Sequence, residues 1–249
     1  MTDKPPGGGR PIEYSLYLES GPRRQKTMVH VLDLLGCIAQ GPTTEAALEA
    51  TPGAIRAYLS FLQGHDEQVE PDAAFSTVVV EHVMEGPWLG NGNPAPGFGP
   101  DFQTLGAEEQ AVYLRRLAWL QAGLLQLIEG LPAEQLAAEP QTRGRSIYRI
   151  LEHVAESQYA YLRAVLGTVD GLPAALRAVR QGPEGVASAL RDVWGLTSAR
   201  LEAMTGAERA KVVQRGQVTW MARRMLRRLL EHNWEHLLEI SERLAEPPG

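Results

Sequence analysis

The stretch MLRRLLEHNWEHLLEI, residues 225–240, decides the fold of the C-terminal part of this 249-residue chain. Five of its residues follow one another at spacings of 4, 3, 4 and 4: Met225, Leu229, His232, His236 and Ile240. This is the spacing of side chains along one face of an α-helix, and three of the five are apolar. The stretch therefore predicts an amphipathic helix with two histidines on its buried face.

His232 and His236 are candidate metal ligands, because residues four apart on a helix project from the same side and two imidazoles can reach one cation. The alternative is a pair of packed core histidines, each hydrogen-bonded to a neighbour. Two buried imidazoles need partners for four ring nitrogens, and a shared metal ion satisfies two of them at once. The pair alone therefore leaves both interpretations open, a metal site and two packed core histidines.

Four helices of about twenty residues are predicted after residue 105, at about 107–129, 146–166, 184–204 and 219–245. The breaks between them are Leu131-Pro132, the turn at Gly144 with residues 171–183, and residues 206–216. This pattern predicts an up-and-down four-helix bundle over residues 106–246, a fold that builds metal sites from facing helices.

The third ligand is expected from the second of these helices, where His153 shares a face with the small residues Ala160 and Ala164. Taken alone, His153 is more typical of a packed core histidine than of a metal ligand. Three neutral imidazoles would leave a fourth position open to water or substrate, as in catalytic metal sites. Zinc is favoured by prevalence and geometry, with nickel, iron and copper as alternatives. Glu156 is a weak candidate for a base or a fourth ligand, and a solvated carboxylate is its other interpretation.

The basic run at residues 223–228 is followed on the same helix by four glutamates, so it predicts a solvated helix face. Glu231 and Glu235 are expected to face outward, against Arg227 and Arg228. Three tryptophans are expected in the bundle core or on a dimer surface: Trp194, Trp220 and Trp234.

The N-terminal part predicts a small α/β domain over residues 11–85. Strand-like runs at 12–18 and 27–39 precede a helix that begins near Thr43-Thr44, and a last strand-like run spans 75–80, in the order β-β-α-β. Pro52-Gly53 is expected to interrupt the helix. A tail over residues 1–10 and a linker over 86–105 are indicated by their glycine and proline content. The whole chain is thus an α+β protein of two domains.

Charge and composition exclude several classes. The net charge of −6 arises in residues 1–100, which hold 6 Lys and Arg against 12 Asp and Glu, while residues 101–249 hold 18 of each. This distribution gives no concentrated basic patch of the kind that binds nucleic acid. The sequence has no apolar run long enough for a membrane span and no secretory signal, so a cytoplasmic location is expected. The single cysteine, Cys37, excludes an intrachain disulfide and a multi-cysteine metal site.

The motifs around residues 146–153 (SIYRILEH) and 225–236 (MLRRLLEHNWEH) resemble those of DinB/YfiT-like four-helix bundles, over about residues 105–245. The resemblance implies a metal held by one histidine of the second helix and the H-x3-H pair of the last, which match His153, His232 and His236. It also implies a homodimer and activities such as thiol-dependent S-transfer, isomerisation or hydrolysis with a low-molecular-weight thiol.

Residues 31–41 (VLDLLGCIAQG) and 44–48 (TEAAL) are similar to HicB-like antitoxin domains, with Leu35 in place of the usual proline. The likeness covers about residues 11–83 and implies a small, partly RNase H-like fold with Cys37 as a small buried residue. No DNA-binding module follows, so an interaction or ligand-binding module is expected.

Two functions from different classes remain open at this point. The first is a metal-dependent enzyme that activates a thiol or water for transfer to, or hydrolysis of, a small-molecule substrate. The second is a non-enzymatic sensor of a small ligand whose N-terminal domain contacts a protein partner. A structural bundle with three incidental histidines is the third interpretation.

Overall fold

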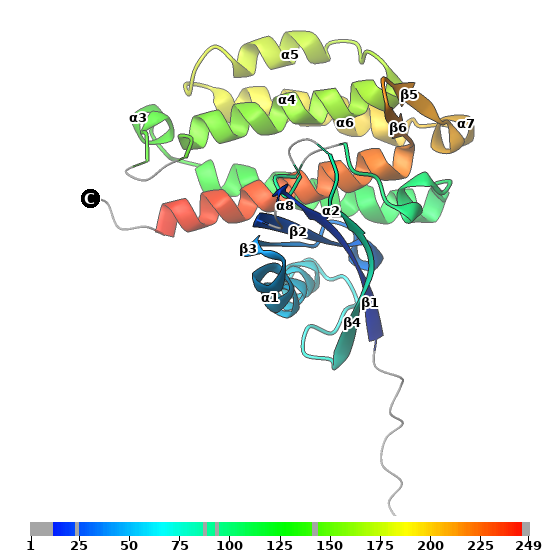
Figure 1. The fold of residues 1–249 in the computed structure, drawn as a ribbon. Coiled ribbons are helices and arrows are strands. Elements are labelled where there is room, and N and C mark those ends of the chain that lie inside the picture. Colours follow the sequence, from blue (N-terminus) through cyan, green and yellow to red (C-terminus); the bar gives the residue numbers. More distant parts are fainter. Residues whose placement is uncertain (1–11, 23–24, 87–88, 93–94, 141–143, 246–249) are drawn as a thin grey trace, which may run out of the picture. The chain divides into compact units, whose positions relative to one another are not determined.

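The computed structural model describes residues 12–22, 25–86, 89–92, 95–140 and 144–245, and the tail predicted at residues 1–10 lies outside them. The chain forms two compact units, Met1–Pro96 and Gly97–Gly249. The first is an α/β sheet unit and the second is helical, which confirms the predicted α+β class (Figure 1). The division falls inside the segment predicted as a linker.

The first unit is a four-stranded sheet in the order β3-β2-β1-β4 with one long helix. β1 pairs antiparallel with β2 and parallel with β4, and β2 pairs antiparallel with β3. Its elements are β1 (Ile12–Ser20), β2 (Gln25–Val31), β3 (Ile38–Thr43), α1 (Thr44–Gln63) and β4 (Phe75–Val83).

The strand-like run predicted at 27–39 is two strands, so the order is β-β-β-α-β. A short 3-10 helix (Leu32–Leu34) and Gly36, at φ 108°, turn the chain between β2 and β3. The Val31 N–H donates to the Cys37 carbonyl at 3.1 Å and closes this turn. Cys37 itself is fully buried, as expected.

α1 runs through Pro52 without a break, contrary to the predicted interruption. Ile55, Tyr58 and Leu62 are fully buried on its core-facing side and hold the second half of the helix in place. The start of the helix is as predicted: the Thr43 hydroxyl caps it by accepting a hydrogen bond from the Ala46 N–H at 3.1 Å.

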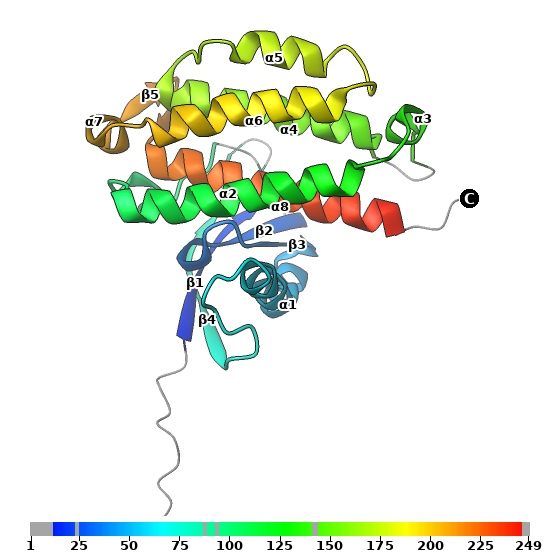
Figure 2. The ribbon, with the colours of Figure 1, turned by 180° about the vertical axis from the view of Figure 1, so that it is seen from behind.

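The second unit contains, among the described residues, four long helices with shorter elements between them (Figures 1 and 2). Its elements are the 3-10 helix η3 (Gly99–Phe102), α2 (Ala107–Ile128), α3 (Ala133–Ala137), α4 (Ile147–Leu166), α5 (Leu172–Val179), α6 (Val186–Glu202), α7 (Gly206–Ala210), β5 (Val213–Arg215), β6 (Val218–Trp220) and α8 (Ala222–Ala245). The long helices α2, α4, α6 and α8 correspond closely to the four that were predicted.

The order of helix directions differs from the predicted up-and-down bundle. α5, inside the segment predicted as a break, carries the chain back along α4, and the Val179 carbonyl at its end accepts a hydrogen bond from the hydroxyl of Tyr148 in the first turn of α4. α6 therefore starts beside the start of α4 and runs parallel to it (Figure 2). α8 is antiparallel to α4, and the resulting order is up-down-down-up.

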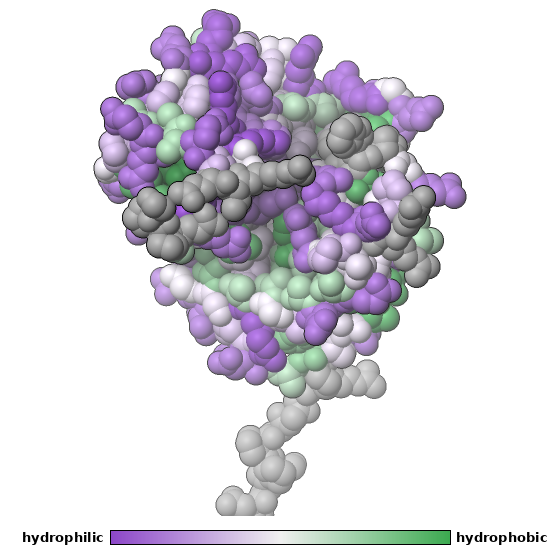
Figure 3. Space-filling view, turned by 60° about the vertical axis from the view of Figure 1, so that its left-hand side comes forward, coloured by the Kyte–Doolittle hydropathy of each residue, from purple (hydrophilic) through white to green (hydrophobic). Residues whose placement is uncertain are grey.

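The hairpin β5–β6 was also missed, because its strands are only three residues long. None of the described helices is long and apolar enough to cross a membrane. In the upper part of Figure 3, over the helical unit, hydrophilic side chains predominate, as they do on a bundle whose apolar stripes point inward.

Candidate metal centre

α4 and α8 carry the three predicted histidines to one place in the helical unit. His153 lies in the second turn of α4 and is half-buried, while His232 and His236 lie one turn apart on α8 and are 5% and 6% exposed. α4 starts with the Ser146 hydroxyl as its cap, which accepts from the Arg149 N–H at 3.4 Å.

The imidazoles converge on a single point. The Nε2 atom of His232 lies 3.0 Å from Nε2 of His153 and 3.2 Å from Nε2 of His236. Two nitrogens bound tetrahedrally to one zinc ion are about 3.3 Å apart. In the described part of the chain, these histidines form the one group of three or more potential ligands close enough to share an ion, with all ligand atoms within 4.8 Å of one another.

Burial keeps two of these rings neutral at pH 7. Burial, followed by the charge of Arg145 and that of His236, lowers the pKa of His153 to about 4. Burial, followed by the neighbouring His236 and His153, holds the pKa of His232 well below its ordinary value. A neutral imidazole has a lone pair to offer, so the donor set has the chemistry that a transition metal needs.

Glu239, which the sequence pattern predicts only as one of four glutamates that balance the basic run, orients the third ring. Its carboxylate lies 2.7 Å from Nδ1 of His236, and this hydrogen bond lowers the pKa of Glu239. A proton on Nδ1 leaves the Nε2 lone pair directed at the other histidines. The available signal was the spacing: Glu239 follows His236 by three residues, on the same side of the helix.

Glu156 lies elsewhere. Its carboxylate is 42% exposed and forms an ion pair with Arg180, at the end of α5, with an N–O distance of 2.6 Å. It is not a member of the group that could share an ion. A role for Glu156 as a base or a fourth ligand therefore stays a prediction.

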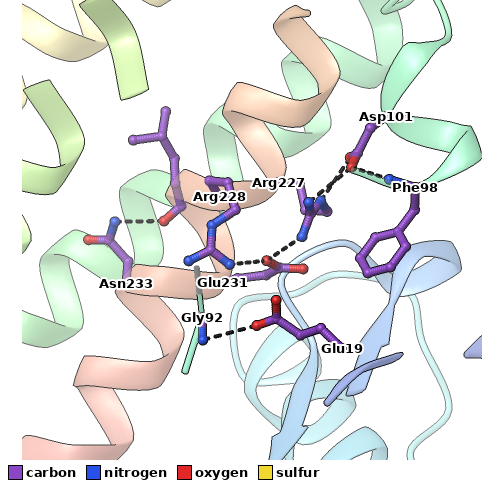
Figure 4. Close-up of polar contacts among 9 residues, drawn as sticks. Glu19, Gly92, Phe98, Asp101, Arg227, Arg228, Glu231 and Asn233 are labelled. Carbon is purple, nitrogen blue, oxygen red and sulfur yellow. Dashed lines mark hydrogen bonds and ion pairs between the residues drawn. The ribbon is translucent and has the colours of Figure 1, made fainter. Parts of the chain in front are cut away.

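Three arginines of α8 are buried, which corrects the predicted solvated face. Arg224, Arg227 and Arg228 are each 1% exposed, and so is Glu231, which was predicted to face outward. One Glu231 oxygen accepts from Arg227 at 3.0 Å and from Arg228 at 2.9 Å (Figure 4). These arginines and Glu231 pair with one another inside the protein. The balance of opposite charges along the helix therefore did not indicate a solvated face.

Asp101 completes this network from η3. Its two carboxylate oxygens accept from Nε and Nη2 of Arg227 at 2.8 and 2.9 Å, a bidentate pair, and the Phe98 N–H donates to it at 3.0 Å (Figure 4). The guanidinium of Arg227 also lies over the Phe98 ring, 5.2 Å from its centre. Residues that the sequence placed in a linker thus belong to the packing of the helical unit.

Tyr161 connects the arginine network with the histidines. Its ring meets His232 edge-on with 5.9 Å between centres, and Arg228 lies 5.7 Å from the centre of the same ring. Trp220 packs on Tyr161 at 6.1 Å. The Tyr161 ring therefore contacts both Arg228 and His232, and it restricts the movement of the His232 ring.

A helical unit with three convergent imidazoles on two antiparallel helices, two of them buried and one half-buried, defines a class of bundle proteins with a potential metal centre. The family model of the DinB superfamily matches residues 116–240, half of the chain, and the protein belongs to that superfamily. The matched region contains all three histidines. No curated protein and no solved structure matches the chain.

Proposed function

We propose that the protein is a metal-dependent enzyme that activates a thiol or a water molecule for transfer to, or hydrolysis of, a small molecule. The convergence of three Nε2 atoms on one point carries the proposal. His153, His232 and His236 would hold a divalent transition metal, with zinc first and nickel or iron as alternatives.

The bound ion would supply a Lewis acid that lowers the pKa of a coordinated thiol or water toward neutrality. The chain's own residues supply the rest. Glu239 holds the proton on Nδ1 of His236, and the Tyr161 ring fixes the plane of His232. Three protein ligands leave a coordination position for the reactant, which distinguishes a catalytic site from a closed structural one.

The partners follow from the same site: a small-molecule substrate, a low-molecular-weight thiol as co-substrate, and a second copy of the chain as in other bundles of this kind. We further propose that the first unit is a HicB-like interaction or ligand-binding module. Buried Cys37 and the junction between β3 and the capped start of α1 support this likeness, since both lie in the motif that suggested it.

Metal content tests the proposal. The chain is purified without tag or chelator and analysed for elements beside His232→Ala/His236→Ala, with His65→Ala, a histidine of the first unit, as the matched control. About one equivalent of a transition metal in the parent and the control, and none in the double variant, is expected. Metal content that the double variant retains, or a parent that takes up no ion on reconstitution, contradicts the site.

Catalysis is separated from ligand sensing by turnover. The metal-loaded chain is supplied with low-molecular-weight thiols and a panel of electrophiles and esters. Thiol consumption or ester hydrolysis that disappears in the double variant supports an enzyme. A metal-loaded protein that binds the thiols without turning over any substrate supports the sensor instead.

A further inference from the structure

A pocket lies at the C-terminal end of α4, about two turns or more beyond His153. Its volume of about 590 Å³ is in the range of small-molecule sites. α4 and the turn after it contribute Ala160, Arg163, Ala164 and Gly167 to its wall, and the hairpin contributes Arg215 and Trp220. Among the described residues of its lining there are two arginines and no carboxylate.

Arg215 is fixed in place by the end of the helix. Its Nε and Nη2 atoms donate to the carbonyls of Ala164 and Arg163 at 3.1 and 3.3 Å, which satisfies two of the last carbonyls of α4. Three of its five N–H groups remain for other acceptors. Arg163 contributes only its backbone carbonyl to these contacts. Among the described residues, neither arginine takes part in an ion pair.

Trp220 provides an apolar wall beside the two charges. The side chain is 6% exposed, packs on Tyr161 and has the Arg224 guanidinium 4.9 Å from its ring centre. A lining that combines an aromatic residue with two arginines matches a molecule with an apolar body and an anionic group.

We propose that this pocket binds the carboxylate or phosphate group of a small molecule with an apolar or aromatic body. Arg163 and Arg215 would bind the anion through their remaining N–H groups, as guanidinium groups do with planar or tetrahedral oxyanions. Trp220 would contact the apolar body.

The position of the pocket also suggests a substrate class, a step that rests on the proposed function. Ala160 and Ala164 follow His153 by 7 and 11 residues, so they share its face of α4 and lie roughly 10 to 16 Å further along the helix. A substrate held in the pocket by its anionic end would need an extended body to bring its other end to the histidines.

The anion site is tested first, without metal. Binding of 3-phenylpropionate and of phenyl phosphate, against the uncharged 3-phenylpropanol, is measured by calorimetry on the metal-free chain and on His232→Ala/His236→Ala. Both anions are expected to bind at least tenfold more tightly than the alcohol, and amide NMR signals of Gly167 and Thr168 to shift. The carboxylate and phosphate arms show which oxyanion the pocket prefers.

Arg163→Gln is the informative variant, because the Arg163 side chain supports no described contact of the fold. We expect it to weaken anion binding about tenfold or more, and the control Arg191→Gln, at an exposed arginine of α6, to have no effect. Equal affinity for the alcohol and the anions, or unchanged binding in Arg163→Gln, overturns the site.

The substrate step has its own readout. The cobalt-loaded chain is titrated with 8-mercaptooctanoate and 3-mercaptopropionate, and the thiolate-to-cobalt absorption band is followed. 8-Mercaptooctanoate, whose chain is longer by five methylene groups, is expected to bind at least tenfold more tightly, and this advantage is expected to vanish in Arg163→Gln. Equal affinities for the two thiols overturn the proposal of an extended substrate. A chain that binds no cobalt overturns the proposed function and this step together, and leaves the anion site to the first test.

Discussion

The Nδ1 atom of His236 and the Oε2 atom of Glu239 lie 2.7 Å apart, one helical turn from each other on α8. The carboxylate is also 3.4 Å from Nη2 of Arg243, the next turn along. Glu239 thus places a negative charge beside Nδ1 of His236, while Nε2 of the same ring faces the two other imidazoles. Such a carboxylate raises the basicity of a ligating histidine and fixes its tautomer.

Replacing Glu239 with glutamine should weaken zinc binding about 10- to 100-fold, because the neutral amide no longer stabilises the Nδ1 proton as a carboxylate does. Competition with a chromogenic chelator measures the zinc affinity. Glu242→Gln, at an exposed glutamate of the same helix, is the control and should leave the affinity unchanged. If Glu239→Gln binds zinc as tightly as the parent, the carboxylate does not position His236.

Asp101→Asn should lower the free energy of unfolding of the helical unit by about 3 kcal/mol, because it removes one charge of a fully buried, bidentate pair with Arg227. Urea unfolding followed by far-UV circular dichroism measures the loss. Asp170→Asn makes the same chemical change at an exposed aspartate in the loop before α5 and should change stability by less than about 0.5 kcal/mol. Equal midpoints for both variants would falsify the structural role of this pair.

The histidine site could be predicted because its information is local. Two ligands lie within one helix, where spacing alone defines a shared face, and the third lies on a helix with the same kind of apolar periodicity. The burial of Arg227 could not be predicted this way. Its bidentate partner, Asp101, is 126 residues away in a segment rich in glycine and proline, so no periodicity connects them.

The prediction of the helix directions was wrong for a related reason. Whether α6 runs parallel or antiparallel to α4 depends on where the connection between them leads, and that connection contains an eight-residue helix between glycines. The glycines and Pro173 predict a plain break between two helices, and the structure has a short helix there. Pro173 lies in the first turn of α5, where proline is tolerated because no hydrogen bond from its nitrogen is required.

Gly41→Ala should lower the stability of the first unit by about 1–3 kcal/mol, because a Cβ atom there would lie 2.4 Å from the Ala47 nitrogen, a backbone atom that cannot move aside. Gly53→Ala is the matched control. It lies within α1 with nothing within 4 Å of the added Cβ, so alanine there should stabilise the unit by about 0.5–1 kcal/mol. Thermal unfolding of the two variants measures these opposite shifts, and a shift of the same sign in both contradicts the packing.

Glu208→Gln should lower stability at pH 7 by about 1 kcal/mol, and the loss should disappear in acid. The Glu208 carboxylate accepts from the Thr205 N–H at 2.9 Å and pairs with Arg200, and these contacts lower its pKa below 4.5. The folded chain therefore releases this proton more readily than the unfolded chain, so the stabilisation is complete above pH 4.5 and is lost as the pH falls through the lower folded-state value.

Unfolding midpoints of parent and variant, measured from pH 7 to about pH 3, should converge at the acid end. Glu202→Gln, at an exposed glutamate near the end of α6, should follow the parent throughout. A gap between the Glu208→Gln and parent curves that stays constant across this range would mean that the charge of Glu208 does not contribute to the cap.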